Sequence, residues 1–295
     1  MTLGSHYREA AAAALAASLA LGGCAREPAP HGRVRIVAIE RVYGDVARQL
    51  GGAGVDVTTL LDSPSADPHD YEPTTRDADA ISDADVVVEN GLGYDAFADR
   101  LLAASPSATR TVIDVGSLGG HRIGDNPHVW YEMRSLRRFS DAVAAAIARR
   151  TPAERRAVET RRAAFDRWTD AFDARLAAIG ARHGGARIAI TEPVFDYVLH
   201  AAHLTIATPV SFSHAIEEGN DPAPQDVDAM RALIGGRDVA AFVYNAQTVE
   251  PATTNLLALA ATAKVPVVPV TETLPPDRTT QTWMDGEAAA LGHAL

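Results

Sequence analysis

Residues 34–61 read VRIVAIERVYGDVARQLGGAGVDVTTLL, and this stretch decides the fold class. The apolar run at 34–39 predicts a buried strand, and residues 41–50 have the spacing of an amphipathic helix that ends at the glycine pair 51–52. Residues 55–61 predict a second strand. Strands that alternate with helices form βαβ units and parallel sheets. The sequence therefore predicts an α/β protein.

The same alternation continues on both sides of a long helical segment. Further strands are expected at 85–89, 111–115, 187–191, 239–244 and 265–270, and helices at 94–104, 195–202, 225–234 and 253–263. Because the pattern occurs twice, we expect two Rossmann-like lobes, each with a parallel sheet.

Residues 134–182 carry no strand pattern and no glycine before Gly180. Apolar residues recur there at helical spacing, and Thr151-Pro152-Ala153-Glu154 is typical of a helix start. A second helix of about 28 residues would be about 42 Å long. We expect a long, rigid interlobe helix. Its many arginines favour a solvated, ion-paired face, with a membrane or nucleic-acid contact as the alternative.

The N-terminus carries the pattern of an export signal. Residues 10–23 are small and apolar, and Cys24 follows them directly. The run is too short to span a bilayer but long enough for the core of a signal peptide. Leu21-Gly22-Gly23-Cys24 resembles a bacterial lipobox, in which the cysteine carries the lipid anchor. The alternative is an alanine-rich buried helix with Cys24 as an ordinary apolar residue.

These elements predict five segments along the chain. They are a lipoprotein signal peptide at 1–23, a tether at 24–33, an N-terminal α/β lobe at 34–133, a helical connector at 134–182 and a C-terminal α/β lobe at 183–295.

The composition excludes several classes of protein. With 295 residues, 47% of them hydrophobic, the chain has enough apolar surface for a packed core, which excludes intrinsic disorder. A net charge of −11 argues against nucleic acid as a partner, because phosphate binding needs clustered Lys and Arg. The single cysteine, Cys24, permits no intramolecular disulfide and no cysteine-based zinc cluster.

Two histidines follow prolines in similar local contexts. His69 lies in DPHDYEP at 67–73 and His128 in NPHVW at 126–130, and each segment comes after a predicted strand. Open α/β sheets bind ligands beyond the carboxyl ends of their strands. A proline-stiffened loop that holds an imidazole at this edge suits a metal ligand, which must be ordered before the ion arrives.

Two glutamates occupy equivalent positions in the second half. Glu192 follows the strand predicted at 187–191, and Glu272 follows the strand at 265–270. Together with the two histidines they would form a mixed nitrogen and oxygen metal site in the cleft between the lobes. The alternative is that the histidines are exposed loop residues and that the glutamates merely lie near helix N-termini.

Several motifs together resemble one family, the metal-binding solute-binding proteins of zinc and manganese ABC importers, known as cluster A-I or cluster 9. The motifs are DPHDYEP at 67–73, NGLG at 90–93, NPHVWYE at 126–132, the long helix and TEPVFDYV at 191–198. The resemblance implies that His69, His128, Glu192 and Glu272 are the metal ligands, with Glu192 at the family's third ligand position and Glu272 where the fourth is usually Asp.

The resemblance also implies the biological role. We expect a monomeric receptor, lipid-anchored outside the cytoplasm, that captures one divalent ion and delivers it to an ABC permease without catalysis. Two imidazoles and two carboxylates favour Mn²⁺, because bidentate carboxylates could raise the coordination number to five or six. Zn²⁺ would bind the same ligands tetrahedrally, and Fe²⁺ is a further candidate. The alternatives are a metalloenzyme or chelatase with an open coordination position, and an adhesin.

Overall fold

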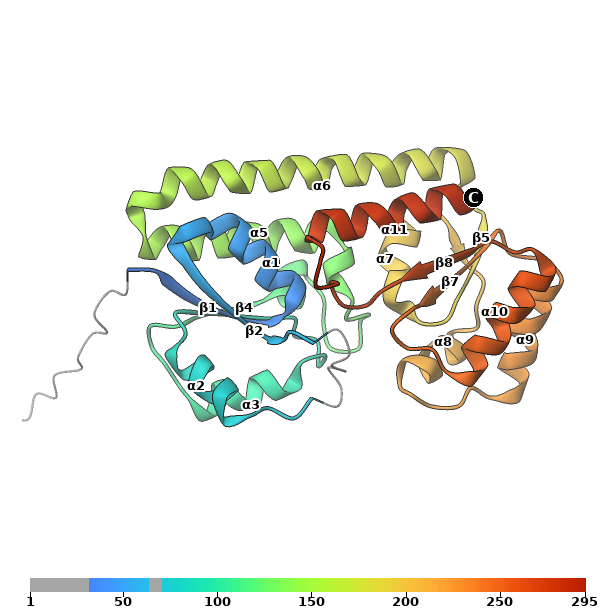
Figure 1. Cartoon of the computed structure of the whole chain (residues 1–295), viewed down its shortest axis with the longest axis horizontal. Helices are drawn as coiled ribbons and strands as arrows, with labels where there is room; N and C mark the ends of the chain where they lie inside the picture. The colour runs from blue at the N-terminus through green and yellow to red at the C-terminus, as the bar shows by residue number, and fades with distance from the viewer. Residues whose placement is uncertain (1–31, 64–70) are drawn as a thin grey trace, which may run out of the picture. The chain divides into compact units, whose positions relative to one another are not determined.

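Two four-stranded parallel sheets form the framework of the computed structural model, which describes residues 32–63 and 71–295 (Figure 1). The predictions for the signal peptide at 1–23, for Cys24 and for His69 lie outside the described residues. Residues Arg33–Leu295 form one compact unit that contains both sheets.

Both sheets have the same topology. The first contains β1 (Val34–Glu40), β2 (Val55–Leu61), β3 (Val86–Glu89) and β4 (Thr111–Asp114) in the order β2-β1-β3-β4. The second contains β5 (Arg187–Ile190), β6 (Thr205–Ile206), β7 (Ala241–Asn245) and β8 (Val267–Val270) in the order β6-β5-β7-β8. All neighbouring strands pair in parallel, so the predicted α/β fold with two parallel sheets is confirmed.

The central strands are buried, which explains their apolar sequences. All four residues of β3, VVVE, are buried, and so are six of the seven residues of β1. A strand covered by helices on both faces has no solvent side and so shows no polar alternation. The predicted strands agree with the structure to within two residues at each end, but the two-residue strand β6 was too short for the sequence pattern to indicate.

Helices cover the sheets on both faces. Around the first sheet they are α1 (Arg41–Gly51), α2 (Thr75–Asp83), α3 (Ala96–Ala104) and α4 (Val115–Gly119), and around the second α7 (Asp196–Ala201), α8 (Val210–Glu217), α9 (Pro224–Gly235) and α10 (Pro251–Ala263). In the part of the chain that the structure describes, no helix is both long and apolar enough to cross a membrane.

The helical segment after the first sheet contains two helices, α5 (Met133–Arg150) and α6 (Arg155–His183). They are separated at Thr151 and Pro152, where the sequence predicted that a helix restarts. With 29 residues, α6 is about 44 Å long. It lies against α5, α1, α7 and α11, and so passes both sheets (Figure 1). The predicted long interlobe helix is therefore confirmed.

The C-terminal helix α11 (Thr280–Ala294) runs beside α6 and returns to the first lobe, a contact that the sequence pattern did not reveal (Figure 1). Its first residue, Thr280, donates through its backbone N and its Oγ1 to Oδ2 of Asp45 on α1, at 2.8 and 2.7 Å. The next residue, Gln281, exchanges side-chain hydrogen bonds with Gln49 of α1. Two chain segments therefore join the lobes, α6 and α11.

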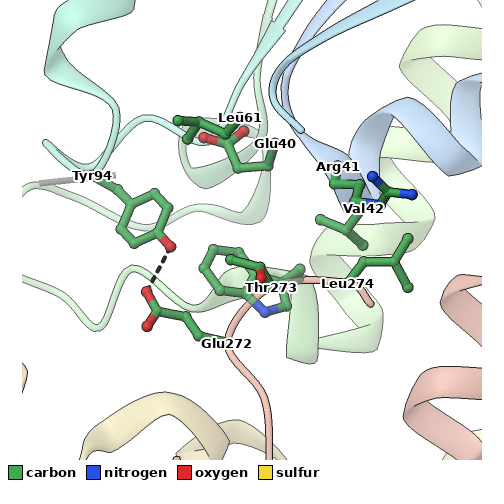
Figure 2. Close-up of a pocket in the computed structure, with 9 residues that line it drawn as sticks. Glu40, Arg41, Val42, Leu61, Tyr94, Glu272, Thr273 and Leu274 are labelled. Atoms are coloured by element: carbon green, nitrogen blue, oxygen red, sulfur yellow. Dashed lines mark hydrogen bonds between the residues drawn. The ribbon is translucent and has the colours of Figure 1, made fainter. Parts of the chain in front are cut away.

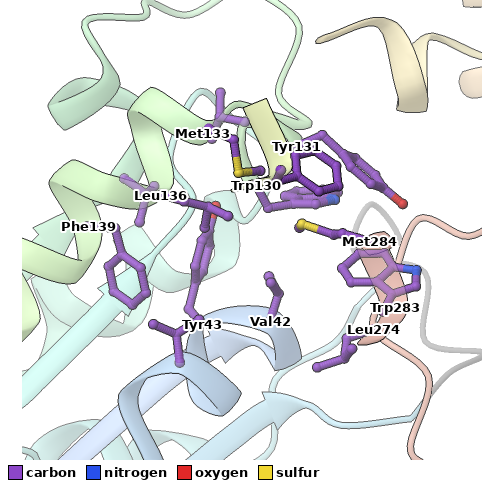
Figure 3. Close-up of a cluster of buried hydrophobic side chains, with 14 of the residues drawn as sticks. Val42, Tyr43, Trp130, Tyr131, Met133, Leu136, Phe139, Leu274, Trp283 and Met284 are labelled. Carbon is purple, nitrogen blue, oxygen red and sulfur yellow. The ribbon is translucent and has the colours of Figure 1, made fainter. Parts of the chain in front are cut away.

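One hydrophobic core extends across both lobes. It includes Ile36 of β1 and Ile190 of β5. Figure 3 shows part of this core, with aromatic and sulfur-containing side chains from four parts of the chain. They are Tyr43 of α1, Trp130 and Tyr131 of the 3-10 helix η2 (Val129–Tyr131), Met133 and Phe139 of α5, and Trp283 and Met284 of α11. A continuous packed interior resists large relative motion of the lobes, because separating them would expose these side chains to water.

Candidate metal centre

Three of the predicted site residues lie beyond the carboxyl ends of strands. Glu192 follows β5, Glu272 follows β8, and His128 lies in the segment between the first sheet and η2. In the second sheet the chain passes from β5 to β6 on one side and then from β6 to β7 on the other side of β5. The strand order therefore reverses between β5 and β7, which is the topological switch point of this sheet. Ligands of open α/β sheets bind at such points.

His128 is 1% exposed, and the side chain of Asn126 fixes its orientation. Asn126 Nδ2 donates to the carbonyl of Pro193 at 2.7 Å, so its Oδ1 faces His128. This oxygen accepts a hydrogen bond from the backbone N of His128 at 2.9 Å and lies 2.7 Å from Nδ1 of the ring. Because Oδ1 can only accept, Nδ1 carries a proton, and Nε2 is the nitrogen that has a lone pair when the ring is neutral. An imidazole in this tautomer can bind a cation through Nε2.

The Nε2 side of the ring faces Glu272. The distance from Nε2 to Oε1 of Glu272 is 3.6 Å. The same oxygen accepts a 2.6 Å hydrogen bond from the hydroxyl of Tyr94. Tyr94 and Glu272 line a pocket of about 290 Å³, its open mouth included, together with Glu40, Arg41 and residues of the loop after β8 (Figure 2).

Glu192 is 6% exposed, and its two carboxylate oxygens have different surroundings. Oε2 accepts a 2.9 Å hydrogen bond from Nδ2 of Asn245. Oε1 is buried and accepts no hydrogen bond from any residue in the described ranges. A buried carboxylate oxygen without a donor is unfavourable unless a cation or a proton compensates it.

The electrostatics of these groups are coupled. Burial acts to lower the pKa of His128, but the hydrogen bond with Glu272 and the negative charges of Glu272, Glu217 and Glu192 outweigh it, so that the pKa is raised. Burial raises the pKa of Glu192 to about 7, and the charge of Glu272 adds to this while the hydrogen bond from Asn245 opposes it. The carboxylates repel one another and attract positive charge, which is the electrostatic condition for a cation site.

Two further acidic side chains lie close to His128. Glu217, the last residue of α8, places Oε1 3.9 Å from Nδ1 of the ring. Asp196, the first residue of α7, has its pKa raised to about 7, chiefly by burial. The region around His128 is therefore more acidic than the two glutamates predicted from the sequence would make it.

The described residues do not form a finished coordination sphere. Within residues 32–63 and 71–295, no group of three or more His, Cys, Asp or Glu side chains is arranged so that it could hold a metal ion as it stands. The structure brings together His128, Glu192 and Glu272, whereas His69 lies outside the described residues. A bound ion would have to draw the carboxylates toward the ring.

A family model described as "ZnuA: Zinc-uptake complex component A periplasmic" matches residues 36–294. The chain belongs to this family. The description is that of a component of an uptake complex, which agrees with the sequence-based prediction that the chain is a binding protein and not an enzyme.

Curated relatives of this ZnuA-family chain match over shorter stretches. The manganese-binding lipoprotein MntA of Halalkalibacterium halodurans is 28% identical over 123 residues, which cover 40% of each protein. The iron-binding protein YfeA of Yersinia pestis is 23% identical over 150 residues, 49% of this chain and 48% of the relative. The chain thus matches less than half the length of these relatives.

Solved structures resemble this family member over nearly the whole fold. The SBP FpvC of Pseudomonas aeruginosa, in complex with Mn²⁺, has a TM-score of 0.71 at 20% identity, covering 89% of this chain and 98% of FpvC. The periplasmic zinc-binding protein TroA of Treponema pallidum has a TM-score of 0.71 at 18% identity, covering 89% of this chain and 99% of TroA. At these identities the likeness shows the fold alone.

Five residues near the site in this ZnuA-family chain were not predicted as part of it: Tyr94, Asn126, Asp196, Glu217 and Asn245. Asn245 ends β7 at the same sheet edge as Glu192 and Glu272. The rule that side chains at the carboxyl ends of parallel strands form the binding site, which indicated the glutamates, therefore also applied to Asn245. It was missed because the prediction considered only side chains that ligate metals directly.

Proposed function

We propose that this chain is the extracytoplasmic binding component of an ABC importer, which captures one divalent transition-metal ion and passes it to a membrane permease. Family membership supports the role in uptake. The names of relatives and structural neighbours support the type of cargo, since they refer to manganese, iron and zinc.

The observation that carries the proposal is the relation between His128 and Glu272. Their facing atoms, Nε2 and Oε1, are 3.6 Å apart. Two atoms that are each about 2.1 Å from one ion, at a tetrahedral angle, lie about 3.4 Å apart. The pair is thus spaced nearly as two ligands of a shared ion, which would take the place of a proton on Nε2, since Nδ1 donates to Asn126.

The proposed ligand set is His69, His128, Glu192 and Glu272. Glu192 contributes an oxygen that is buried without a donor among the described residues. His69 is assigned from its sequence motif, DPHDYEP, alone. The imidazoles belong to the first half of the chain and the carboxylates to the second, so an ion bound by all four would join the two lobes.

Ion binding by this chain would involve small movements. The lobes share one hydrophobic core, and both α6 and α11 connect them. We therefore propose that binding rearranges side chains and loops at the cleft, with at most a slight tilt of the lobes, and that the permease recognises this ion-bound shape.

We further propose that Cys24 carries a lipid anchor and that the receptor acts as a monomer at the outer face of the cell membrane, with the segment boundaries predicted from the sequence. The lipobox-like residues 21–24 support the anchor, and so do relatives that are named as lipoproteins. Mn²⁺, Zn²⁺ and Fe²⁺ remain the candidate cargoes.

Calorimetric titration of chelator-treated protein with each metal tests the proposal. We expect one ion per chain, and a loss of affinity of at least about 100-fold in His128→Ala and Glu192→Ala, because each removes a direct ligand. His200→Ala, an exposed histidine on α7, serves as the matched control and should bind as the wild type does. Unchanged binding in both ligand variants would contradict the proposed site.

A further inference from the structure

We propose that Asn245 limits the two carboxylates of the site to one metal-binding oxygen each and thereby selects for a four-coordinate ion. This inference rests on the proposed function, because it concerns the selectivity of the same site.

Asn245 is held rigidly between the strands that present the glutamates. It is the last residue of β7, which pairs with β5 on one side and with β8 on the other. The residue is buried, with 1% of its surface exposed. Its backbone N donates to Oγ1 of Thr191 at 3.1 Å. Its Oδ1 accepts from the backbone N of Gln247 at 3.0 Å, so the amide NH₂ group must face the carboxylates.

The NH₂ group contacts both glutamates. Nδ2 lies 2.9 Å from Oε2 of Glu192 and 3.3 Å from Oε2 of Glu272. One donor group placed between two like charges reduces their repulsion and fixes how each carboxylate is rotated. In both glutamates the atom engaged by Asn245 is Oε2.

The other oxygen of each carboxylate, Oε1, has different surroundings. Oε1 of Glu272 is the atom 3.6 Å from Nε2 of His128. Oε1 of Glu192 is buried without a donor among the described residues. A bidentate carboxylate must turn both oxygens toward the ion, and here that rotation would draw each Oε2 away from Nδ2 of Asn245 and weaken a hydrogen bond in a buried site.

The resulting donor set is small. One oxygen from each glutamate and one nitrogen from His128 give three protein atoms, and one further ligand completes four. Four-coordinate tetrahedral sites suit Zn²⁺, whereas Mn²⁺ favours five or six hard ligands. The hydrogen bonds of Asn245 therefore argue against the bidentate coordination on which the sequence-based preference for Mn²⁺ depended.

Co²⁺ serves as the probe, because its visible absorption is intense in four-coordinate sites and weak in six-coordinate ones. Spectra are recorded for the wild type, for Asn245→Ala, and for Asn255→Ala as a control on the exposed surface of α10. The affinities for Zn²⁺ and Mn²⁺ are then measured by competition against Co²⁺.

We expect intense absorption from the wild type and the control, and a marked loss of intensity in Asn245→Ala. The ratio of the Mn²⁺ to the Zn²⁺ dissociation constant should fall by about tenfold or more in that variant, in line with the effect of other residues that support metal ligands. If Asn245→Ala does not fold, Asn245→Ser, which also lacks the NH₂ group, is measured in its place.

An unchanged spectrum and an unchanged affinity ratio in a folded variant would overturn the role of Asn245, as would weak absorption from the wild type. If instead the proposed function were wrong, the wild type would bind neither Co²⁺ nor Zn²⁺ at the site, and this outcome can be told apart from the two above.

Discussion

The hydroxyl of Tyr94 donates a 2.6 Å hydrogen bond to Oε1 of Glu272, a residue 178 positions later in the chain. Burial and the adjacent negative charge of Glu272 raise the pKa of Tyr94 well above its ordinary value, so the phenol remains a donor at any physiological pH. The bond joins a residue that follows β3 to one that follows β8, and its acceptor is the oxygen nearest to Nε2 of His128. A contact between the lobes therefore also orients a proposed metal ligand.

Replacing Tyr94 with Phe should weaken both the contact between the lobes and the orientation of Glu272. We expect the free energy of unfolding of the metal-free protein to fall by about 1 kcal/mol, the usual net value of one hydrogen bond. Zn²⁺ affinity should fall by about tenfold, because Glu272 loses a group that orients it. Urea unfolding and metal titration measure the two effects.

Tyr244→Phe on β7 is the control for loss of a phenol hydroxyl, and we expect it to change neither quantity. If Tyr94→Phe retained full stability and full Zn²⁺ affinity, the contact between Tyr94 and Glu272 would have no part in positioning the ligand.

Asn126 should determine which ring nitrogen of His128 is protonated. In Asn126→Ala, Nδ1 loses its acceptor and the carbonyl of Pro193 loses its donor. We expect Zn²⁺ affinity to fall by about 10- to 100-fold, the range observed when the partner of a ligating histidine is removed. Nitrogen NMR of the metal-free wild type, recorded at a pH high enough for the ring to be neutral, should show a protonated Nδ1 and a bare Nε2 in His128. The opposite tautomer would refute this role.

Glu89 should make stability depend on pH. Burial, followed by the charges of Asp95 and two further aspartates, raises its pKa from 4.5 to about 8. The folded state thus holds this proton more tightly than the unfolded state does. The stability that the group contributes is complete below its unfolded pKa of 4.5 and is lost as the pH rises through about 8.

The variant Glu89→Gln removes this titration. Near pH 8.5 we expect the metal-free variant to be more stable than the wild type by about 2 kcal/mol, a value reduced from the full shift because the effective dielectric constant around buried charges in proteins is high. Near pH 5 the two should be similar. Urea unfolding at both pH values measures the difference, with the exposed Glu159→Gln on α6 as control. Equal pH profiles for Glu89→Gln and the wild type would rule out the raised pKa.

Asp45 should hold the start of α11 against the first lobe. Its Oδ2 accepts two hydrogen bonds from Thr280 and one from Gln49. In Asp45→Ala the free energy of unfolding should fall by about 1 to 2 kcal/mol, and amide hydrogen exchange should accelerate in the first turn of α11. Asp56→Ala, at an exposed position of β2, is the control. Unaltered exchange in α11 would show that the helix is held by its apolar face alone.

The strands were predictable because each central strand is a short apolar run between helices. The central strand β1 begins at the predicted residue, Val34, and ends at Glu40, one residue after the predicted end. The same regularity led to His128, Glu192 and Glu272, since the carboxyl ends of parallel strands are where side chains converge. Local pattern was sufficient for these elements.

Other features depend on contacts between distant segments. The return of α11 to α1 involves Asp45 and Thr280, which are 235 residues apart. Asn245 acquires its role only because β7 lies between β5 and β8, and strand order cannot be read from periodicity. Glu217 ends α8, a helix whose pattern was not recognised in the sequence.

The most direct test of the metal site is an anomalous difference map from crystals of chelator-treated protein to which one equivalent of Zn²⁺ has been added. We predict one peak per chain, about 2.0 to 2.2 Å from Nε2 of His128 and from one oxygen each of Glu192 and Glu272. A peak that lies elsewhere, or a map without density among these three residues, would contradict the site.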